Sequence, residues 1–425
     1  MGAFDKVIGY ENIKLELRQI VDMLKNPDRY AALGAEIPKG VLLYGNPGMG
    51  KTMMATALMN EAGVKAITVR RTKKDGEIVD DIVDAFAFAK ANAPAIILLD
   101  DMDKFANEDE DHCDAEEYVT VQTCIDELQA ENVLVMATVN KIRKLPRSLT
   151  RAGRFDRKIH MGSPTDDEAI NILQHYLEDK PVAGNIDVQD IYKMVNTSSS
   201  AEIKMVLNEA AIIAGYEQCE KIEMRHLVEA TLRRYYGGPS EHEIKVKEIE
   251  IEKEALHEAA HIVVAESLMP ESIGFASIRP ESRGECGGFV QRKSTEIRRP
   301  HHIMISLAGK VATEMRFSGI AGGCSKDLRE AVGAITDGLM YNATRGFSLL
   351  DQHKLATSES YYLRMESAVN AELERYTIEV RDILLRNSEL LERVAEELVQ
   401  KQCLLFSDVQ RIKAECGLVK KEVVC

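Results

Sequence analysis

The sequence predicts an α/β module built on a parallel sheet with helices on both faces, then a small helical lid, then a mainly α-helical domain. Two observations lead to this fold class. Apolar, β-rich runs alternate with helical stretches through roughly the first 160 residues, which is typical of a parallel sheet covered on both faces. Beyond this part, apolar residues recur at helical spacing. The predicted domains cover residues 1–163, 164–237 and 238–425.

Five short runs rich in apolar and β-branched residues are the predicted strands of the sheet. They are Gly40–Tyr44, Ala66–Val69, Ala95–Leu99, Val133–Thr138 and Lys158–Met161. Such short apolar runs are typical of strands that are covered on both faces. The polar residues that follow these strands should lie at the carboxyl edge of the sheet, where ligands of this fold class bind.

The helical segments after the sheet carry apolar stripes. In the predicted lid, Ile170, Leu173 and Leu177 follow one helix face. Gly237–Ser240 cannot continue a helix and a charged stretch comes next, so the last domain is expected to start here. In the tail, apolar residues alternate four and three apart within 369–398, which favours long helices packed in a domain core over a free coiled coil.

The composition is that of a soluble globular protein, with 45% hydrophobic and 29% charged residues. A formal net charge of −15 argues against nucleic-acid binding, which needs clustered Lys and Arg. The eight cysteines include no CxxC pair, so neither a disulfide framework nor a thiolate zinc site is expected. No apolar run approaches the ~20 residues of a membrane span, and the start lacks the order of a signal peptide. We therefore expect a cytoplasmic protein without a membrane span in this chain.

A phosphate-binding motif follows the first predicted strand. Residues 45–52 read GNPGMGKT and satisfy GxxxxGK[ST]. Glycines let successive backbone N–H groups turn toward phosphates, Lys51 should reach the β and γ oxygens, and Thr52 should bind magnesium. The predicted nucleotide-binding residues are Gly45, Asn46, Pro47, Gly48, Met49, Gly50, Lys51 and Thr52. Since strand, loop and helix come in the required order, a chance glycine-rich turn is the poorer explanation.

Polar residues after two later strands fit the same site. Asp100 and Asp101 follow the strand 95–99. At the carboxyl edge of the sheet, Asp100 would hold magnesium and Asp101 would orient the attacking water. Asn140 comes shortly after the strand 133–138 and is suited to position water beside the γ-phosphate. We therefore expect ATP and Mg²⁺ as ligands of the first half.

The second half contains an HExxH motif in a helical context, HEAAH at residues 257–261. His257 and His261 are four apart, so they share a helix face and can bind one metal ion, while Glu258 can act as general base toward water. Zinc is the ion expected for two imidazoles, a carboxylate and an open position. Many carboxylates are eligible as the third ligand. Two histidines without a metal are the poorer explanation, because few chance matches have a fitting helix.

The order of the P-loop, LLDDMD, ATVN and RAGRFDR resembles the AAA ATPases, and specifically the FtsH family of ATP-dependent zinc proteases. The resemblance covers nearly the whole chain. It implies a P-loop AAA+ module with a helical lid, followed by a zinc metallopeptidase domain. It also implies that Asn140 is a sensor residue, and that Arg154 and Arg157 are arginine fingers for the ATP of a neighbouring subunit. A finger that acts in trans requires a ring, and the family forms hexamers.

Further assignments come from the same resemblance. Ile8 and Gly9 match the adenine-contacting segment of the family, and His175 matches its lid histidine. The segment SKDL at 325–328, after the turn 319–323, matches the one whose aspartate completes the zinc site, which makes Asp327 the third ligand of one zinc ion per subunit. The segment GGFV at 287–290 resembles the edge strand that binds substrate by backbone pairing.

These assignments imply an ATP-dependent zinc metalloendopeptidase that cuts unfolded or flexible proteins inside a homo-oligomeric, hexameric ring. Three features depart from the family. Its membrane anchor is absent from this chain, and Asp101 replaces a longer glutamate, so we expect slow ATP hydrolysis. The loop near 73–76 is basic and lacks the aromatic residue with which the family grips substrate, and the second pore loop region, 108–114, is acidic. In a ring of six chains these loops would form a basic ring near an acidic ring. Two solvated loops explain the sequence equally well. The alternatives are an ATP-regulated peptidase that does not thread its substrate, and a chaperone or scaffold ring with an idle zinc site.

Overall fold

The structure is a computed structural model that describes most of the chain. The described residues are 2–35, 38–71, 77–106, 115–128, 131–195, 199–236, 248–279, 288–292, 298–317, 324–341 and 359–420. The predicted pore loops at 73–76 and 108–114, the break at 237–240, the turn at 319–323 and Gly287 lie outside these residues. The chain forms two compact units, Met1–Asp179 with Thr197–Met205, and Lys180–Asn196 with Val206–Cys425. The three predicted domain ranges stay a prediction.

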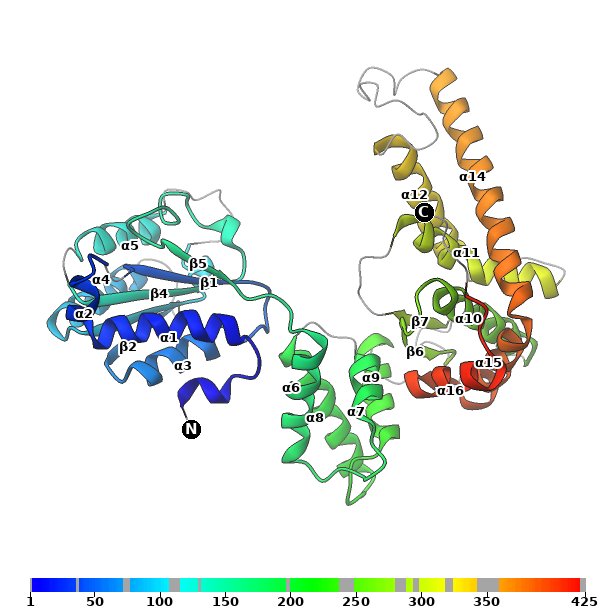
Figure 1. Ribbon diagram of the computed structural model, residues 1–425, viewed down its shortest axis with the longest axis horizontal. Helices are drawn as coiled ribbons and strands as arrows, with labels where there is room; N and C mark the ends of the chain where they lie inside the picture. Colours follow the sequence, from blue (N-terminus) through cyan, green and yellow to red (C-terminus); the bar gives the residue numbers. More distant parts are fainter. Residues whose placement is uncertain are drawn as a thin grey trace. The chain divides into compact units, whose positions relative to one another are not determined.

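The first unit holds a five-stranded, fully parallel sheet in the order β2-β3-β4-β1-β5 (Figure 1). The strands are β1 (Gly40–Tyr44), β2 (Lys65–Arg70), β3 (Ala95–Asp100), β4 (Val133–Val139) and β5 (Arg157–His160). All five predicted strands are present, and every boundary agrees with the prediction to within one residue. The predicted parallel sheet is confirmed.

Helices cover both faces of this sheet (Figure 1). The helices of the unit are η1 (Ala3–Lys6), α1 (Glu11–Lys25), α2 (Pro27–Ala31), α3 (Lys51–Ala62), α4 (Glu77–Ala91), η2 (Met102–Lys104), α5 (Glu116–Asp126), η3 (Ile142–Lys144) and α6 (Asp166–Glu178). Side chains alternate along each strand, so Leu42 and Ile97 enter a core with α4 and α5. Val41 and Ile96 point the other way, into a core with α1 and α3. The strand ends, with their polar residues, stay outside both cores.

The second unit is mainly helical and contains a small antiparallel sheet in the order β7-β6-β8. Its helices are α7 (Val188–Val195), α9 (Met224–Tyr236), α10 (Glu248–Leu268), α11 (Arg299–Arg316), α12 (Cys324–Tyr341), α14 (Glu359–Arg386), α15 (Ser388–Lys401) and α16 (Phe406–Cys416). Its strands are β6 (Ile273–Ser277), β7 (Phe289–Arg292) and β8 (Cys403–Leu405). The remaining helix, α8 (Ser200–Tyr216), contributes residues to both units.

Helix α10, which carries the HExxH motif, lies in the core of the second unit. Every residue from 255 to 268 is buried, as expected for a helix that is apolar on most sides. Its neighbours in the same core come from α11, α12, α14, α15 and α16. Tail residues such as Val380 and Val394 belong to this core. The preference for core packing over a free coiled coil is therefore confirmed.

A buried carboxylate joins the end of α10 to the small sheet. Glu266 is 0% exposed and accepts the backbone N–H groups of Glu271 and Ile273, both at 2.9 Å. Lys413 of α16 donates to the same carboxylate, so the buried charge is paired. This contact fixes β6 relative to the helix that carries the metal-binding motif. None of the described helices combines the length and the apolar character that a membrane span requires.

Candidate functional site

Residues 45–50 form the loop between β1 and α3, and Lys51 and Thr52 open α3, as the motif predicts. Gly48 has a φ of 81°, in the left-handed region that favours glycine. A Cβ on Gly45 would lie 2.1 Å from the carbonyl oxygen of Met161, so no larger residue fits there. Because α3 starts at Lys51, the free N–H groups of its first turn lie at the loop. The loop has the shape and the donors that a phosphate group requires.

Lys51 and Thr52 already have partners at the loop. Lys51 Nζ donates to the carbonyl oxygens of Gly45 and Asn46, at 2.8 Å each, and burial lowers the pKa of this amine. Thr52 Oγ1 donates to Asp100 Oδ1 at 2.8 Å. The structure therefore brings together the two groups predicted to hold magnesium.

Asp101 and Asn140 also lie side by side. Asp101 follows β3 with a left-handed backbone, at a φ of 55°. Asn140 Nδ2 donates to Asp101 Oδ1 at 3.4 Å, and the Asn140 backbone N–H donates to Asp103 Oδ2 at 3.2 Å. The predicted sensor residue thus lies next to the acid predicted to orient water. Asp103, which sequence reasoning missed, holds the Asn140 backbone in place.

A pocket beside the loop is lined by Ile8 and His175, two of the residues predicted near the base of the nucleotide, but not by Gly9. Its walls include Ile8, Tyr10, Met49, His175, Tyr176 and Ser200. Gly48 and Gly50 line the same pocket, which therefore joins the phosphate loop. Gly9 has a φ of 76°, and a Cβ there would lie 2.6 Å from Glu168 Oε1, so this glycine allows the first turn of α6 to approach. Tyr10 and Tyr176 were not predicted.

The two predicted arginine fingers contact polar groups of their own chain. Arg154 lies 3.0 Å (Nε) and 2.7 Å (Nη2) from the Asp126 carboxylate, and its Nη1 donates to Gln122 at 2.7 Å. The Arg157 side chain, at the start of β5, is 55% exposed and lies 3.3 Å from Glu16. The role of these arginines toward a neighbouring nucleotide stays a prediction.

In the second unit, three predicted metal ligands converge. The Nε2 atoms of His257 and His261 are 3.0 Å apart on α10. Asp327, in the first turn of α12, places Oδ2 at 3.1 Å from the first and 3.3 Å from the second. A tetrahedral zinc ion with bonds of ~2.0–2.2 Å separates its ligand atoms by ~3.3–3.6 Å. The three separations lie at or slightly below this range, so small side-chain shifts would let these donors hold one ion. Within the described residues the group has these three members, which leaves a coordination position for water or substrate.

The second ring nitrogen of each histidine is also held. His261 Nδ1 lies 2.7 Å from the carbonyl oxygen of Ile305, so in the neutral ring Nδ1 carries the proton and the lone pair of Nε2 is left for a metal ion. His257 Nδ1 lies 3.8 Å from the buried thiol of Cys324. Gly309 brings α11 against the other side of His257, because a Cβ there would lie only 2.3 Å from the imidazole ring. Sequence reasoning missed these supporting residues.

Burial and charge act in opposite directions at this centre. Burial opposes a charge on His257, but the hydrogen bond from its ring to Asp327 prevails and raises the pKa of His257. Burial lowers the pKa of His261. Burial also works against the Asp327 carboxylate, yet the two imidazoles hold the pKa of Asp327 well below its usual range. The centre therefore keeps an ionised carboxylate between two imidazoles, which suits a divalent cation.

Glu258 is buried beside the centre with a second acid, Glu254, as its neighbour. Burial raises the pKa of Glu258 to about 8, and the Glu254 carboxylate adds to this effect, so the group can exchange protons near neutral pH. Glu254 hydrogen-bonds Glu258 and accepts the backbone N–H of Gly288. Gly288 must be a glycine, since a Cβ would lie 2.5 Å from Glu258 Cγ. Glu254 was missed, although its spacing of four from Glu258 places both on one helix face.

These residues open onto one pocket. Its other walls include Phe289, Val290, Arg292, Ser306, Lys326 and Glu330. Strand β7 forms one wall and is the outer strand of its sheet, so the edge strand predicted within 287–290 is present in the described part, from Phe289 onward. Burial lowers the pKa of Arg292 within this wall. The pocket combines charged groups with a strand edge that an extended peptide could join.

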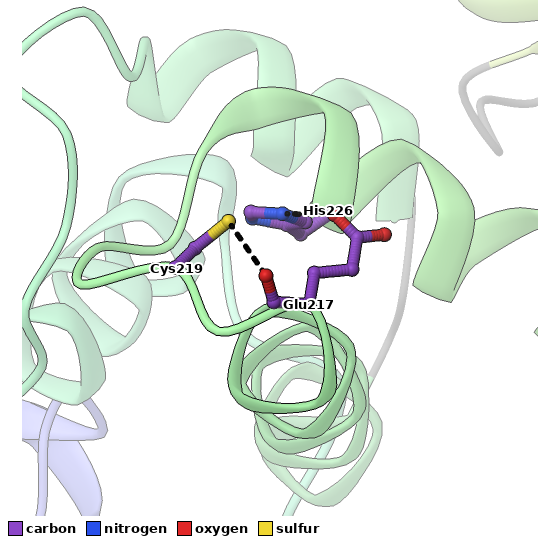
Figure 2. A group of neighbouring side chains, drawn as sticks. All are labelled: Glu217, Cys219 and His226. Carbon is purple, nitrogen blue, oxygen red and sulfur yellow. Dashed lines mark hydrogen bonds and ion pairs between the residues drawn. The ribbon is translucent and has the colours of Figure 1, made fainter.

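A second group of metal-binding residue types, Glu217, Cys219 and His226, lies between α8 and α9 (Figure 2). His226 Nδ1 accepts the backbone N–H of Glu223 at 2.9 Å, so Nε2 carries the proton of the neutral ring and lies 3.3 Å from Glu217 Oε2. Arg225 contacts the Glu217 carboxylate and lies 3.2 Å from Cys219 Sγ. His226 thus caps the start of α9, and the Arg225 guanidinium contacts both the Glu217 carboxylate and the Cys219 thiol. These contacts explain the group without a metal ion.

Comparisons with known proteins match the first half of the chain to a family model and nearly the whole chain to individual relatives. The family model for the ATPase family associated with various cellular activities (AAA) matches residues 41–163. ATP-dependent zinc metalloprotease FtsH 2 of Thermoanaerobacter sp. is 30% identical, over 97% of this chain and 83% of its own length. ATP-dependent zinc metalloprotease FtsH of Thermus thermophilus is 31% identical, over 96% of this chain and 70% of its own length. ATP-dependent zinc metalloprotease FtsH 2 of Sphaerobacter thermophilus is 32% identical, over 95% of this chain and 65% of its own length. The chain thus spans less than two thirds of the last of these. With its parallel α/β module and helical second half, the chain belongs to the FtsH family of ATP-dependent zinc metalloproteases.

Proposed function

We propose that this chain is an ATP-dependent zinc metalloendopeptidase that hydrolyses peptide bonds of unfolded or flexible proteins. The observation that carries the proposal is the convergence of His257, His261 and Asp327 beside the buried Glu258. The family relation and the phosphate loop support an ATP requirement. Among known proteins, the relatives that share both halves are named for this activity.

In the proposed reaction, His257, His261 and Asp327 hold the zinc ion. When bound, zinc polarises the scissile carbonyl and acidifies water. Glu258 accepts the proton of the attacking water on its carboxylate and later delivers it to the leaving amine. The outer edge of β7 binds the peptide in an extended form, and Gly288 keeps this strand close to Glu258.

In the proposed nucleotide site, the loop N–H groups and Lys51 bind the phosphates. Lys51 Nζ would exchange its two carbonyl partners for phosphate oxygens. Thr52 and Asp100 would hold Mg²⁺, which neutralises phosphate charge when bound. Asp101 and Asn140 orient the attacking water, and the shorter Asp101 makes hydrolysis slow. The base binds in the pocket that Ile8 and His175 line.

The proposed assembly is a hexameric ring of identical chains. Arg154 and Arg157 would then act on the nucleotide of the next chain. Arg154 would have to leave the Asp126 carboxylate to do so. Arg157 is more exposed than Arg154 and would have to leave only the Glu16 carboxylate of the described residues in the first unit.

A cleavage assay on an unstructured fluorogenic peptide tests the peptidase proposal. With Mg²⁺-ATP, we expect cleavage that a zinc chelator abolishes and that Glu258→Gln lowers by ~10²-fold or more. Glu252→Gln, on the exposed side of α10, is the matched control and should cleave like the parent. Parental cleavage by Glu258→Gln would refute the mechanism. In Lys51→Ala, ATP should no longer stimulate cleavage of the peptide.

The same assay separates the two alternatives. A peptidase that does not thread its substrate is suggested by the missing aromatic at 73–76. Such a protein would cut the loose peptide but leave a tagged, folded substrate intact with ATP. A chaperone or scaffold ring would bind one zinc ion per chain and cut neither substrate. Destruction of the folded substrate that depends on ATP would exclude both.

A further inference from the structure

Each acid at the end of β3 is paired with a basic side chain that was not predicted to belong to the nucleotide site. Arg70 Nε lies 2.8 Å from Asp100 Oδ2. Lys104 Nζ lies 2.7 Å from Asp101 Oδ2. Both proposed functions of these acids, holding magnesium and orienting water, need a free carboxylate oxygen. The two basic residues therefore bear directly on the proposed nucleotide chemistry.

The position of Arg70 follows from the sheet. Arg70 is the last residue of β2, and its partner across the parallel pair is Asp100, the last residue of β3. Neighbouring strands in register place paired side chains on the same face, so the guanidinium reaches the carboxylate. This pairing is built into the strand register.

The two oxygens of Asp100 have different partners. Oδ1 accepts the hydroxyl groups of Thr52 at 2.8 Å and Thr138 at 2.7 Å. Oδ2 is the oxygen that Arg70 contacts. The Asp100 side chain is 8% exposed and held from two sides, whereas that of Arg70 is 57% exposed. The carboxylate is therefore the fixed partner, and the guanidinium is the one that can leave.

We propose that Arg70 is a built-in counter-ion that competes with magnesium for Asp100, so that a magnesium–nucleotide complex binds fully only when the guanidinium is displaced. The inference rests on the proposed role of Asp100 in the nucleotide site. An arginine keeps its charge at every physiological pH, so the competition does not depend on pH. Removal of the guanidinium should leave Asp100 available to the metal ion and strengthen its binding.

The test compares Arg70→Gln with the parent and with Arg71→Gln. Arg71 is the next residue and donates to the Lys104 carbonyl oxygen, so it is a neighbouring positive charge that contacts a backbone group. Mn²⁺ serves as the probe for the magnesium position, and its affinity for the protein–ADP complex is measured by electron paramagnetic resonance. We expect about fivefold tighter Mn²⁺ binding for Arg70→Gln, the size expected for a partly exposed ion pair. Arg71→Gln should stay within about twofold of the parent.

Affinity for fluorescent ADP without divalent ions is measured in parallel, and it should be the same in all three proteins. Equal Mn²⁺ affinity in the parent and Arg70→Gln would overturn the proposal. Weaker Mn²⁺ or ADP binding in Arg70→Gln would overturn it too, because Arg70 would then belong to the phosphate-binding groups. If the parent does not bind ADP at all, the proposed nucleotide site fails and the inference with it, an outcome distinct from the other two.

Discussion

Gly309 is the residue through which α11 meets the metal centre, and its replacement by alanine gives a sharp prediction. In a helix interior alanine is preferred over glycine by ~1 kcal/mol, so without an obstacle Gly309→Ala would stabilise α11. The new Cβ would lie 2.3 Å from Cε1 and Nδ1 of His257. This is roughly 1 Å closer than the ~3.5 Å at which carbon atoms normally meet. Since the ring is buried and bonded to Asp327, we expect a net loss of about 1–3 kcal/mol of stability.

The same overlap should weaken zinc binding. Zinc–ligand distances are tolerated within about 0.2 Å, so a ring displaced by a larger amount loses bonding geometry. We expect Gly309→Ala to bind zinc at least ~10-fold more weakly, the size of effect known for disturbed supporting residues. Zinc affinity is measured by competition with a chromogenic chelator, and stability by thermal unfolding of the zinc-free protein.

Gly333→Ala is the matched control. Gly333 lies in α12, the helix that carries Asp327, and a Cβ there meets no atom within 4 Å. This variant should unfold at the same or a higher temperature than the parent and bind zinc equally well. If Gly309→Ala also kept the parental zinc affinity, then close packing of α11 would not fix His257, and the reasoning would be refuted.

Three further predictions concern other parts of the chain. Glu254→Ala removes the acceptor of the Gly288 N–H beside Glu258, so we expect a several-fold higher KM for the peptide. Glu254→Gln keeps a carbonyl oxygen as acceptor, so its KM should stay near that of the parent. A parental KM in Glu254→Ala would contradict this argument. Burial raises the pKa of Tyr118 to about 12, above the ~10 of an unfolded chain, so its contribution to stability is present below pH ~10 and is lost toward pH 12. Unfolding temperatures should therefore fall more steeply over this window in the parent than in Tyr118→Phe, and parallel curves would count against the burial argument. Cys219→Ala should leave zinc content at one ion per chain, while a drop on this substitution would show that the group near α9 binds metal.

Much of the first unit could be predicted because its signals are local. The apolar runs fix the strands, and the motif at 45–52 combines glycines, Lys51 and Thr52 in one continuous segment. Polar residues directly after a strand must lie at its end, which is why Asp100 could be placed beside the loop. Each of these predictions needs only the chain direction and the period of a strand.

The supporting residues could not be found in this way, because they meet across separate elements. Arg70 reaches Asp100 only through the β2–β3 register, which the sequence does not reveal. Asp327 came from family resemblance, and its approach to His261 depends on how α12 packs near α10. Helical spacing could have indicated Glu254, but its contact with the strand after Gly288 depends on tertiary structure. Local sequence patterns show which residues share a face of a helix or strand. Which residues of other elements contact that face is decided by tertiary packing.

The buried contacts of Glu266 make helix α16 a structural support for the helix that carries the candidate metal site. Lys413 is the cation that balances this carboxylate, and it comes from the last helix of the second unit. A chain cut just before that helix would keep every metal ligand yet strand a negative charge in the core, at a cost of about 3–5 kcal/mol. Strand β6 would be held less firmly, and so would β7, which pairs with it beside the candidate site. Loss of α16 would thus disturb the candidate site without removing any of its metal-binding residues.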